Sequence, residues 1–319
     1  MPAPPLKYDL TQKRIWVAGH RGMVGSALVK RLEQENAAEV LTVSRDDLDL
    51  IDSHKVSKWV SDNKPDAIII AAAKVGGIHA NRSYQADFLY QNLMIASNII
   101  HAAHTENVEK LLYLGSSCIY PRNAPQPIEE ASLLTGLLEP TNEGYAIAKI
   151  AGIKLCQMYR RQYGRDFIAA MPTNLYGPGD NYHPENSHVI PALIRKAHNA
   201  KFESSANMEV WGTGKVRREF MYVDDCADAL VFILKHYSDD EHVNVGSGKD
   251  YTIQEIAAKV AHIVGFKGKL TNNTSMPDGT PRKLMASQKL LSLGWFPAQP
   301  LDKGLQMAYD WFLDNAVEA

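Results

Sequence analysis

The feature that most constrains the fold is a glycine-rich loop between a short apolar segment and an amphipathic one. Residues 14–18 are apolar enough for a buried strand, and residues 26–32 have the apolar spacing of a helix. The loop between them carries Gly19, Gly22 and Gly25. Glycines at this spacing let the backbone turn sharply and approach a pyrophosphate, which then rests on the first amides of the helix. Because strand, loop and helix follow in this order, we predict a dinucleotide-binding unit and not a plain turn.

The residues after the second expected strand, 40–43, bear on which dinucleotide binds. In such units a carboxylate at this place selects NAD, whereas an arginine accommodates the 2′-phosphate of NADP. Arg45 follows the strand closely, and Arg21 in the glycine loop adds a second cation that can reach the same phosphate. We therefore predict NADP as the cofactor. The alternative is that Arg45 pairs with Asp46 or Asp47 at the surface.

Strand and helix patterns alternate through the first half of the chain. Continuous apolar residues over 65–73 predict a strand buried in a parallel sheet. Helical spacing over 84–104 and 146–161 predicts two long helices, and 166–171 predicts a further strand. The expected fold class is therefore α/β, a Rossmann-type doubly wound parallel sheet with a smaller α/β C-terminal substrate domain.

The Pro/Gly-rich segment 172–179 indicates where the chain leaves this sheet. We place the domain boundary there, with 1–174 as the NADP-binding Rossmann domain and 175–319 as mainly the substrate domain. A short apolar strand near Val243 predicts that the segment 219–248 returns to the first domain.

The chemistry is expected at the end of the strand that begins near Leu112. That strand runs into Ser116 and Cys118, and Tyr145 and Lys149 stand four residues apart on a predicted helix, so they share one face. An ammonium beside a phenol favours the phenolate and lowers its pKa. Serine, tyrosine and lysine together indicate carbonyl reduction.

A second cluster follows the domain boundary. Residues 210–223 combine Trp211, a glycine turn, and the paired Arg217 and Arg218. An aromatic ring and guanidinium groups can stack on a base and bind a diphosphate. A surface hairpin with solvated charges is the alternative explanation for this segment.

Composition and sequence patterns argue against several other classes of protein. The formal net charge of −2 over 319 residues argues against a nucleic-acid or membrane-surface partner. The odd number of widely spaced cysteines, Cys118, Cys156 and Cys226, is typical of reduced thiols in the cytoplasm and forms no metal-ligand pattern. No apolar run approaches the roughly 20 residues that cross a bilayer. The Pro-rich segment 1–10 is expected to be a disordered leader and not a signal peptide.

These motifs resemble those of the extended short-chain dehydrogenase/reductase family, and within it the epimerase-reductases of GDP-linked sugars. The segments that carry the resemblance extend over nearly the whole chain: 19–25, 71–77, 114–121, 172–178, 186–191 and 277–283. The resemblance implies NADPH-dependent conversion of GDP-4-keto-6-deoxy-D-mannose to GDP-L-fucose, by inversion at C3 and C5 and then hydride reduction at C4. A homodimer is also expected, formed through the two long helices; burial of those helices within one subunit is the alternative.

The resemblance also implies individual roles. The implied catalytic residues are Ser116, Cys118, Tyr145, Lys149 and His188. The implied cofactor-binding residues are Gly19, Arg21, Gly22, Met23, Val24, Gly25, Arg45, Leu114, Gly115, Ser116, Lys149, Pro172, Asn174, Leu175 and His188. The implied GDP-sugar residues are Lys196, Trp211, Arg218 and Asp278. Lys196 stands where members of this family often carry arginine, which weakens bidentate phosphate recognition but keeps the charge.

The proposed chemistry requires such residues. A 4-ketone acidifies the hydrogens on C3 and C5, and inversion needs a base and an acid on opposite faces of the ring. Thiols and imidazoles ordinarily titrate on either side of neutral pH, so they suit proton transfer in both directions. We assign Cys118 as base and His188 as acid; a small buried thiol and a loop-bound histidine are the structural alternatives.

Three other functions compete with this one. A 4,6-dehydratase needs an acid near the strand-end hydroxyl, where this chain has Ser117 and Cys118. A nucleotide-sugar 4-epimerase would retain NAD and would have no use for Arg45 or a cysteine/histidine pair. A non-catalytic NADP-sensing scaffold would not need the intact serine, tyrosine and lysine set.

Overall fold

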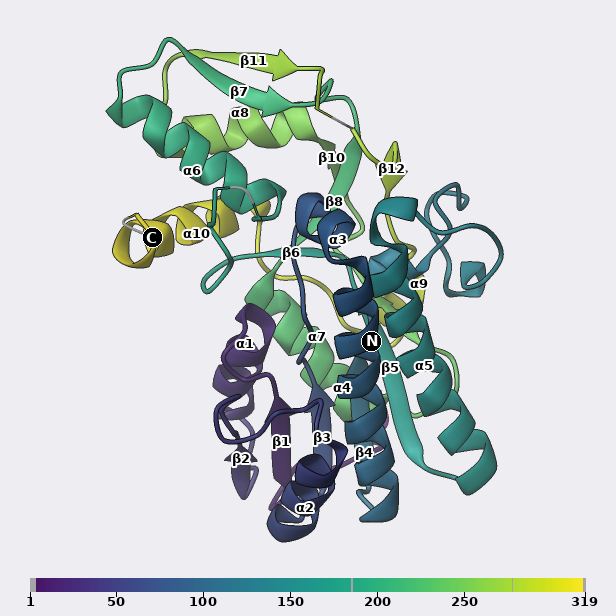
Figure 1. Ribbon diagram of the computed structural model, residues 1–319. Coiled ribbons are helices and arrows are strands. Elements are labelled where there is room, and N and C mark those ends of the chain that lie inside the picture. The colour runs from purple at the N-terminus through teal and green to yellow at the C-terminus, as the bar shows by residue number, and fades with distance from the viewer. Residues whose placement is uncertain (1–3, 185, 277, 318–319) are drawn as a thin grey trace.

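The structure is a computed structural model that describes residues 4–184, 186–276 and 278–317. Its central sheet has six parallel strands in the order β2-β1-β3-β4-β5-β9 (Figure 1). The strands are β1 (Arg14–Ala18), β2 (Glu39–Leu41), β3 (Ala67–Ile70), β4 (Lys110–Leu114), β5 (Asp166–Pro172) and β9 (Val243–Val245). This parallel sheet confirms the predicted Rossmann-type fold class.

Helices cover both faces of this sheet. The helices of this part are α1 (Met23–Leu32), α2 (Ser53–Asn63), α3 (Ile78–Ser83), α4 (Gln85–Thr105), α5 (Glu143–Tyr163), α7 (Val223–His236) and α9 (Gln288–Ser292). Side chains alternate along each strand, so Ile68 packs with α2, α4 and α5, whereas the adjacent Ile69 packs with α1 and α7. Both faces of β3 are therefore buried, which explains its unbroken apolar sequence.

The second lobe is smaller and has its own core. Its strands are β6 (Asn174–Tyr176), β7 (Asn207–Trp211), β8 (Arg217–Tyr222), β10 (Asp250–Thr252), β11 (Lys269–Asn273) and β12 (Arg282–Lys283). Its helices are α6 (Val189–Phe202), α8 (Ile253–Val264) and α10 (Leu301–Asn315). The chain crosses between the lobes more than once, because β8 joins the second sheet while α7 packs on α1 and β9 pairs with β5.

Two local expectations were wrong. The second strand ends at Leu41 and leaves Val43 outside it, and β3 covers only the middle of the apolar run 65–73. The alternative explanation of residues 210–223 as a surface hairpin does not hold, since β7 pairs in parallel with β11 and β8 pairs with β6, β10 and β12. A strand length is decided by its neighbours, which local composition does not reveal.

The expected disordered leader is also wrong for the residues that the structure describes. The amides of Lys7 and Tyr8 both donate to the carbonyl of Lys235 at the end of α7, at 2.8 and 3.0 Å. Leu10 is 1 % exposed and belongs to the core between the sheet and α7. The prolines of this segment prevent a helix but leave its apolar and amide groups free to dock. Residues 1–3 of the leader lie outside the described residues.

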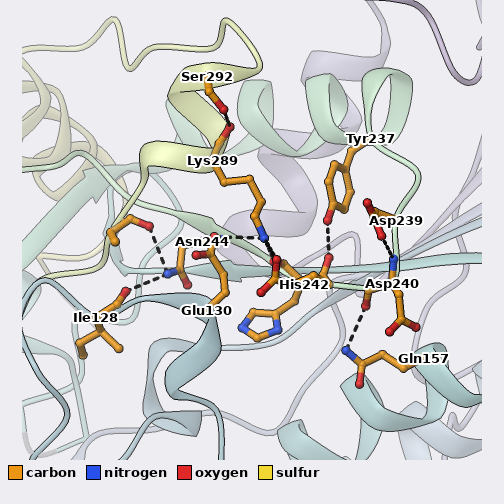
Figure 2. A network of polar contacts seen from close by, with 12 residues as sticks. Ile128, Glu130, Gln157, Tyr237, Asp239, Asp240, His242, Asn244, Lys289 and Ser292 are labelled. Atoms are coloured by element: carbon orange, nitrogen blue, oxygen red, sulfur yellow. Dashed lines mark hydrogen bonds and ion pairs between the residues drawn. The ribbon is translucent and has the colours of Figure 1, made fainter.

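A polar network fixes the segment that follows the strand-end serines. In Figure 2, Asn244 of β9 points toward Ile128, and its side-chain amide donates to that carbonyl at 3.0 Å. The backbone amide of Asn244 donates to Glu130 at 3.1 Å, and Lys289 of α9 lies 4.0 Å from the same carboxylate. The phenol of Tyr120 donates to Asn244 at 2.5 Å and also contacts His242. These contacts attach residues 120–130 to the far edge of the sheet and hold the turn before them in place.

Candidate active site

A cavity of about 1050 Å³ lies at the carboxyl ends of the sheet strands and extends to the second lobe. In open parallel sheets ligands bind at this edge, because loops diverge there. The loops after β1, β3 and β4 line it from one side, and α6, β8 and the residues near β12 line it from the other. The cavity is therefore large enough for a dinucleotide and a second ligand side by side.

The glycine loop forms the first wall of this cavity. Gly19 has a φ of +92°, and a Cβ built there would lie 2.6 Å from the amide nitrogen of Ala72. A Cβ on Gly25 would lie 2.0 Å from the carbonyl oxygen of Gly19. Gly22 is the extended residue before α1, and no side chain caps that helix. The close backbone packing and the uncapped helix start fit the pyrophosphate of a dinucleotide.

Two arginines line the same end of the cavity. Arg21 and Arg45 are both exposed, and neither forms an ion pair with the residues that the structure describes. The surface pairing that was the alternative for Arg45 is not present: Asp47 instead accepts a hydrogen bond from Ser44 at 2.6 Å. Both guanidinium groups are thus available to an anion at the end of the adenosine site.

The remaining cofactor candidates also line the cavity: Met23, Val24, Leu114, Gly115, Pro172, Asn174 and Leu175. Gly115 has a packing reason to be glycine, because a Cβ there would lie 2.2 Å from the sulfur of Met171. Asn174 is held by β8, since its side-chain amide donates to the carbonyl of Glu219 at 2.8 Å.

Ser116, Tyr145 and Lys149 meet where β4 ends against α5. The hydroxyl of Ser116 lies close enough to Tyr145 to lower the pKa of that phenol through hydrogen bonding. The ammonium of Lys149 donates to the carbonyl of Leu114 at 2.7 Å and lies 5.7 Å from the ring centre of Tyr145. The loop after β4 and the first two turns of α5 thus bring a serine, a phenol and an ammonium together.

The electrostatics of this group differ from the expectation. Burial raises the pKa of Tyr145 well above its usual value, and the hydrogen bond from Ser116 offsets only part of that effect. Burial also lowers the pKa of Lys149 to about 8. The predicted lowering of the tyrosine pKa by Lys149 is therefore wrong, because desolvation sets the direction of the shift. Tyr145 is a phenol at neutral pH, which is the form that can donate a proton.

Cys118 and His188 line the cavity from different lobes. Cys118 lies in the turn Ser117–Ile119 and is 6 % exposed, whereas the side chain of His188, just before α6, is 50 % exposed. Burial raises the pKa of Cys118, and the charges of Lys283 and Lys149 and a hydrogen bond with Ser116 oppose that rise. The thiol is therefore neither isolated in an apolar core nor remote from the other candidates.

The predicted GDP-sugar residues lie in the second lobe. The ammonium of Lys196 is 4.4 Å from the ring centre of Trp211, which is 45 % exposed. Arg218 also lines the cavity; burial lowers its pKa, and the charges of Asp278 and Glu139 oppose that effect. This wall offers an exposed indole for stacking beside two cations.

Asp278 has a structural contact that the sequence did not indicate. Its carboxylate accepts from the amide of Thr213 at 2.7 Å and from the hydroxyl of that residue at 2.9 Å. Gly212, with a φ of +75°, allows this approach, because a Cβ there would lie 2.2 Å from the carboxylate. Asp278 thereby holds the loop that follows Trp211.

Two residues of the cavity were missed by the sequence analysis. Lys283 ends β12 opposite Arg218, and its ammonium has no carboxylate within ion-pair distance in the described part of the chain. Asp180 follows the turn after β6 and lies 3.9 Å from His188. Lys283 lies in a segment already noted for its resemblance, but no spacing rule connects either residue to its neighbours in space.

Neither a metal site nor a membrane-spanning helix occurs in the described residues. No group of three or more histidine, cysteine or acidic side chains could hold a metal ion there. No helix of residues 4–184, 186–276 and 278–317 is long and apolar enough to cross a membrane.

The sheet, the glycine loop and the Ser116, Tyr145 and Lys149 group define a dinucleotide-dependent enzyme of the short-chain dehydrogenase/reductase type. The sequence model of the NAD dependent epimerase/dehydratase family matches residues 15–246. The chain belongs to this family, which confirms the resemblance found in the sequence motifs.

Individual relatives make the comparison more specific. A GDP-L-fucose synthase of Sinorhizobium fredii is 56 % identical over 311 residues, which is 98 % of this chain and 99 % of the relative. A crystal structure of a GDP-6-OMe-4-keto-L-xylo-heptose reductase from C. jejuni has a TM-score of 0.89 at 37 % identity and covers 95 % of this chain and 98 % of that one. A GDP-L-fucose synthetase from Naegleria fowleri bound to NADP has a TM-score of 0.88 at 26 % identity, with 99 % and 98 % covered.

Proposed function

We propose that this protein is an NADPH-dependent epimerase and reductase that converts GDP-4-keto-6-deoxy-D-mannose to GDP-L-fucose. The observation that carries the proposal is the position of Cys118 and His188, which line the same cavity as Ser116, Tyr145 and Lys149. A reductase needs only the latter three. The 56 % identity with a GDP-L-fucose synthase supports the choice of substrate.

The epimerisation uses the thiol and the imidazole. Cys118 as thiolate removes the proton from C3, and the electron pair of the broken C–H bond moves to the C4 oxygen as an enolate. His188 as imidazolium protonates C3 from the other face of the ring. Cys118 then releases its proton to solvent and His188 takes one up from solvent, so that the same exchange can invert C5. No net oxidation occurs in these steps. Ser116 donates to the C4 oxygen and thereby stabilises the enolate.

The reduction uses the phenol. NADPH supplies a hydride to C4. Tyr145 donates its proton to the C4 oxygen, Ser116 holds that oxygen, and Lys149 binds the nicotinamide ribose. Burial keeps Tyr145 protonated until the oxygen acquires charge, so the proton is available when it is needed.

The cofactor preference follows from the unpaired arginines. Arg21 and Arg45 provide two cations for the 2′-phosphate of NADP. Replacing Arg45 with alanine should reduce the preference for NADPH over NADH about tenfold or more, because a charge-assisted contact contributes roughly 1.5 to 3 kcal/mol. The ratio of kcat/KM values with the two cofactors measures the change.

Incubation in deuterated water with the sugar nucleotide and NADPH tests the proposal. We expect deuterium at C3 and C5, the galacto configuration of the sugar, and one NADPH oxidised per product. A second candidate is a pure C4 reductase, which the C. jejuni relative described above makes reasonable. Oxidation of NADPH without deuterium at C3 or C5 would establish that candidate and refute ours.

We further propose that the protein is a cytoplasmic homodimer that pairs through α4 and α5. These two helices pack against each other along the sheet, and Figure 1 shows them together on its outer side. Their outward faces expose Tyr90, Ile147, Met158 and Tyr163. The double substitution Ile147→Asp and Met158→Asp should yield monomers in light scattering; an unchanged mass would argue for another interface.

The three cysteines are unpaired in the structure, which supports a reducing compartment.

In this proposal the two lobes bind different ligands. We propose that residues 1–174 bind the cofactor and that 175–319 mainly bind the GDP-sugar, with the segment 219–248 crossing back. This division is supported by the cavity, which has the glycine loop at one end and Trp211 at the other.

A further inference from the structure

The loop after β6 places a buried carboxylate beside the histidine of the proposed acid. The side chain of Asp180 is 4 % exposed, and its Oδ1 lies 3.9 Å from Nδ1 of His188. Gly177 and Gly179 in the same loop have φ values of +145° and +80°, so the loop makes a tight turn before this residue. Both Asp180 and His188 line the cavity.

The hydrogen bonds of Asp180 are incomplete. Its Oδ1 accepts from the backbone amide of Asn181 at 2.7 Å, which forms a local turn. Its Oδ2 is buried and has no hydrogen-bond partner in the described residues. The nearby phenol of Tyr182 donates elsewhere, to the carbonyl of Ala308 at 3.0 Å. An unpaired buried carboxylate oxygen is costly, so this carboxylate can accept at least one more hydrogen bond than the local turn supplies.

We propose that Asp180 is a positioning residue for His188, and this inference rests on the proposed function. The carboxylate attracts Nδ1–H of His188 already in the ligand-free protein and thereby sets the tautomer of the ring, and the contact becomes a full hydrogen bond when the ligands are bound. The present separation of 3.9 Å is within ion-pair range but longer than a hydrogen bond. Because the imidazole is half exposed, its ring can turn toward the carboxylate, and catalytic hydrogen bonds commonly shorten when the substrate binds.

The consequence for the reaction is geometric. With Nδ1–H directed at Asp180, the proton of Nε2 is the one presented to the cavity. After that proton passes to the sugar, the neutral ring keeps its hydrogen on Nδ1, and Nε2 is ready to accept the next one. The carboxylate therefore keeps one tautomer and one ring direction through both inversions, as an aspartate does for other general-base histidines.

The ligand-free protein offers a direct test that does not depend on the proposed function. In protein labelled with ¹⁵N-histidine, the resonances of His188 are assigned by their loss in His188→Gln. We expect the neutral ring of His188 to carry its hydrogen on Nδ1 in the native protein, and this population to fall in Asp180→Asn. A native His188 with its hydrogen on Nε2, or an unchanged tautomer ratio in Asp180→Asn, would overturn the inference.

Kinetics provide the second measurement. Asp180→Asn should slow deuterium incorporation at C3 and C5 about ten- to hundredfold, the effect of removing a carboxylate that orients a histidine. The affinity for NADPH should change less than twofold, and Asp180→Glu should recover part of the exchange. If Asp180→Asn exchanges at the native rate, the inference is wrong, whereas absence of exchange in the native protein would refute the proposed function instead.

A matched control excludes general damage to the fold. Asp225 is another partly buried carboxylate, outside the cavity, whose Oδ2 accepts from the amide of Gln299 at 2.9 Å. Asp225→Asn removes the same charge from α7 and should leave the exchange rate within about twofold. An equal loss of exchange in Asp225→Asn and Asp180→Asn would mean that Asp180 acts through the fold and not through His188.

Discussion

At the scale of single residues, the proton donor for reduction and the base for epimerisation are different side chains at different places in the proposed site. Tyr145 is held by α5 and Ser116, while Cys118 lies in the turn after β4. Neither side chain can replace the other, because a phenol kept protonated by burial is a donor and a thiol must lose its proton to act as a base. Substitutions should therefore divide the reaction into its parts.

Tyr145→Phe removes only the hydroxyl and keeps the ring that packs at 6.3 Å from Phe88. We expect net reduction to fall by about 10² or more, since the proton donor is lost, while deuterium exchange at C3 and C5 continues. Cys118→Ser should show the opposite pattern, with exchange lost and NADPH affinity retained. Loss of exchange in Tyr145→Phe would contradict the separate roles.

Lys283 allows a test of pH dependence. Its ammonium opposes the effect of burial on Cys118, and Lys149, Tyr145 and Ser116 also surround that thiol. Lys283→Met should therefore raise the pKa of Cys118 further and leave less thiolate at neutral pH. Iodoacetamide reacts with the thiolate and not with the thiol. Because the thiolate fraction falls when the positive charge is removed, alkylation of Cys118 should slow about tenfold near neutral pH.

The alkylation profile of Cys118 should also move to higher pH in Lys283→Met. Lys283→Arg keeps the charge and should remain close to the native profile. The internal controls are Cys156 and Cys226, which are 1 % and 0 % exposed and should react in neither variant. An identical Cys118 profile in Lys283→Met and the native protein would show that Lys283 does not affect the thiol.

At the scale of elements, the loop before α1 depends on backbone packing that leaves no room for a side chain. Gly25→Ala places a methyl group against the carbonyl of Gly19, 2.0 Å away, so the loop or the helix must shift. We expect a loss of about 1 to 3 kcal/mol in the free energy of unfolding, together with weaker NADPH binding. Urea unfolding and cofactor titration measure the two effects.

Gly22→Ala is the matched control for that element. A Cβ on Gly22 would lie 3.5 Å from the nearest atom, an ordinary contact, and its φ of −75° suits any residue. The free energy of unfolding of Gly22→Ala should differ from that of the native protein by less than about 1 kcal/mol, as expected for a residue just before a helix. Equal destabilisation by both substitutions would mean that close packing at Gly25 is not the cause.

At the scale of the whole molecule, stability should depend on a histidine far from the cavity. His242 is 2 % exposed within the Tyr120 and Asn244 network, and burial lowers its pKa from 6.5 to about 4. Between these pH values the unfolded chain binds a proton at this residue and the folded chain does not. The unfolded state thus binds more protons, so stability falls as the pH falls from 6.5 toward 4.

The contribution of this histidine should reach about 3 kcal/mol at pH 4, from 1.36 kcal/mol for each pKa unit. His242→Gln stays neutral and should unfold with a flatter pH dependence over that window, measured by urea unfolding at a series of pH values. Parallel curves for the variant and the native protein would show that other groups cause the acid sensitivity.

Much of the architecture followed from local patterns. The unbroken apolar residues of β3 and the glycines before α1 predicted a parallel sheet with a dinucleotide loop, because burial on both faces and close backbone approach each demand particular side chains. Hydrophobic spacing also located the long helices α4 and α5 to within a few residues. The errors arose where contacts with distant segments decide the structure, as for Leu10, which docks in the core, and for β2 and β3, which are shorter than their apolar sequences.

The sequence by itself determined which chemical groups this protein has, including a strand-end serine, a tyrosine and lysine on one helical face, and a thiol two residues beyond the serine. Only the tertiary structure decided what surrounds them. Lys283 lies near Cys118 because β12 pairs with β8, and Asp180 lies near His188 because the loop turns at Gly177 and Gly179, just before Asp180. Burial and charge depend on contacts between distant segments, and no local pattern records those contacts.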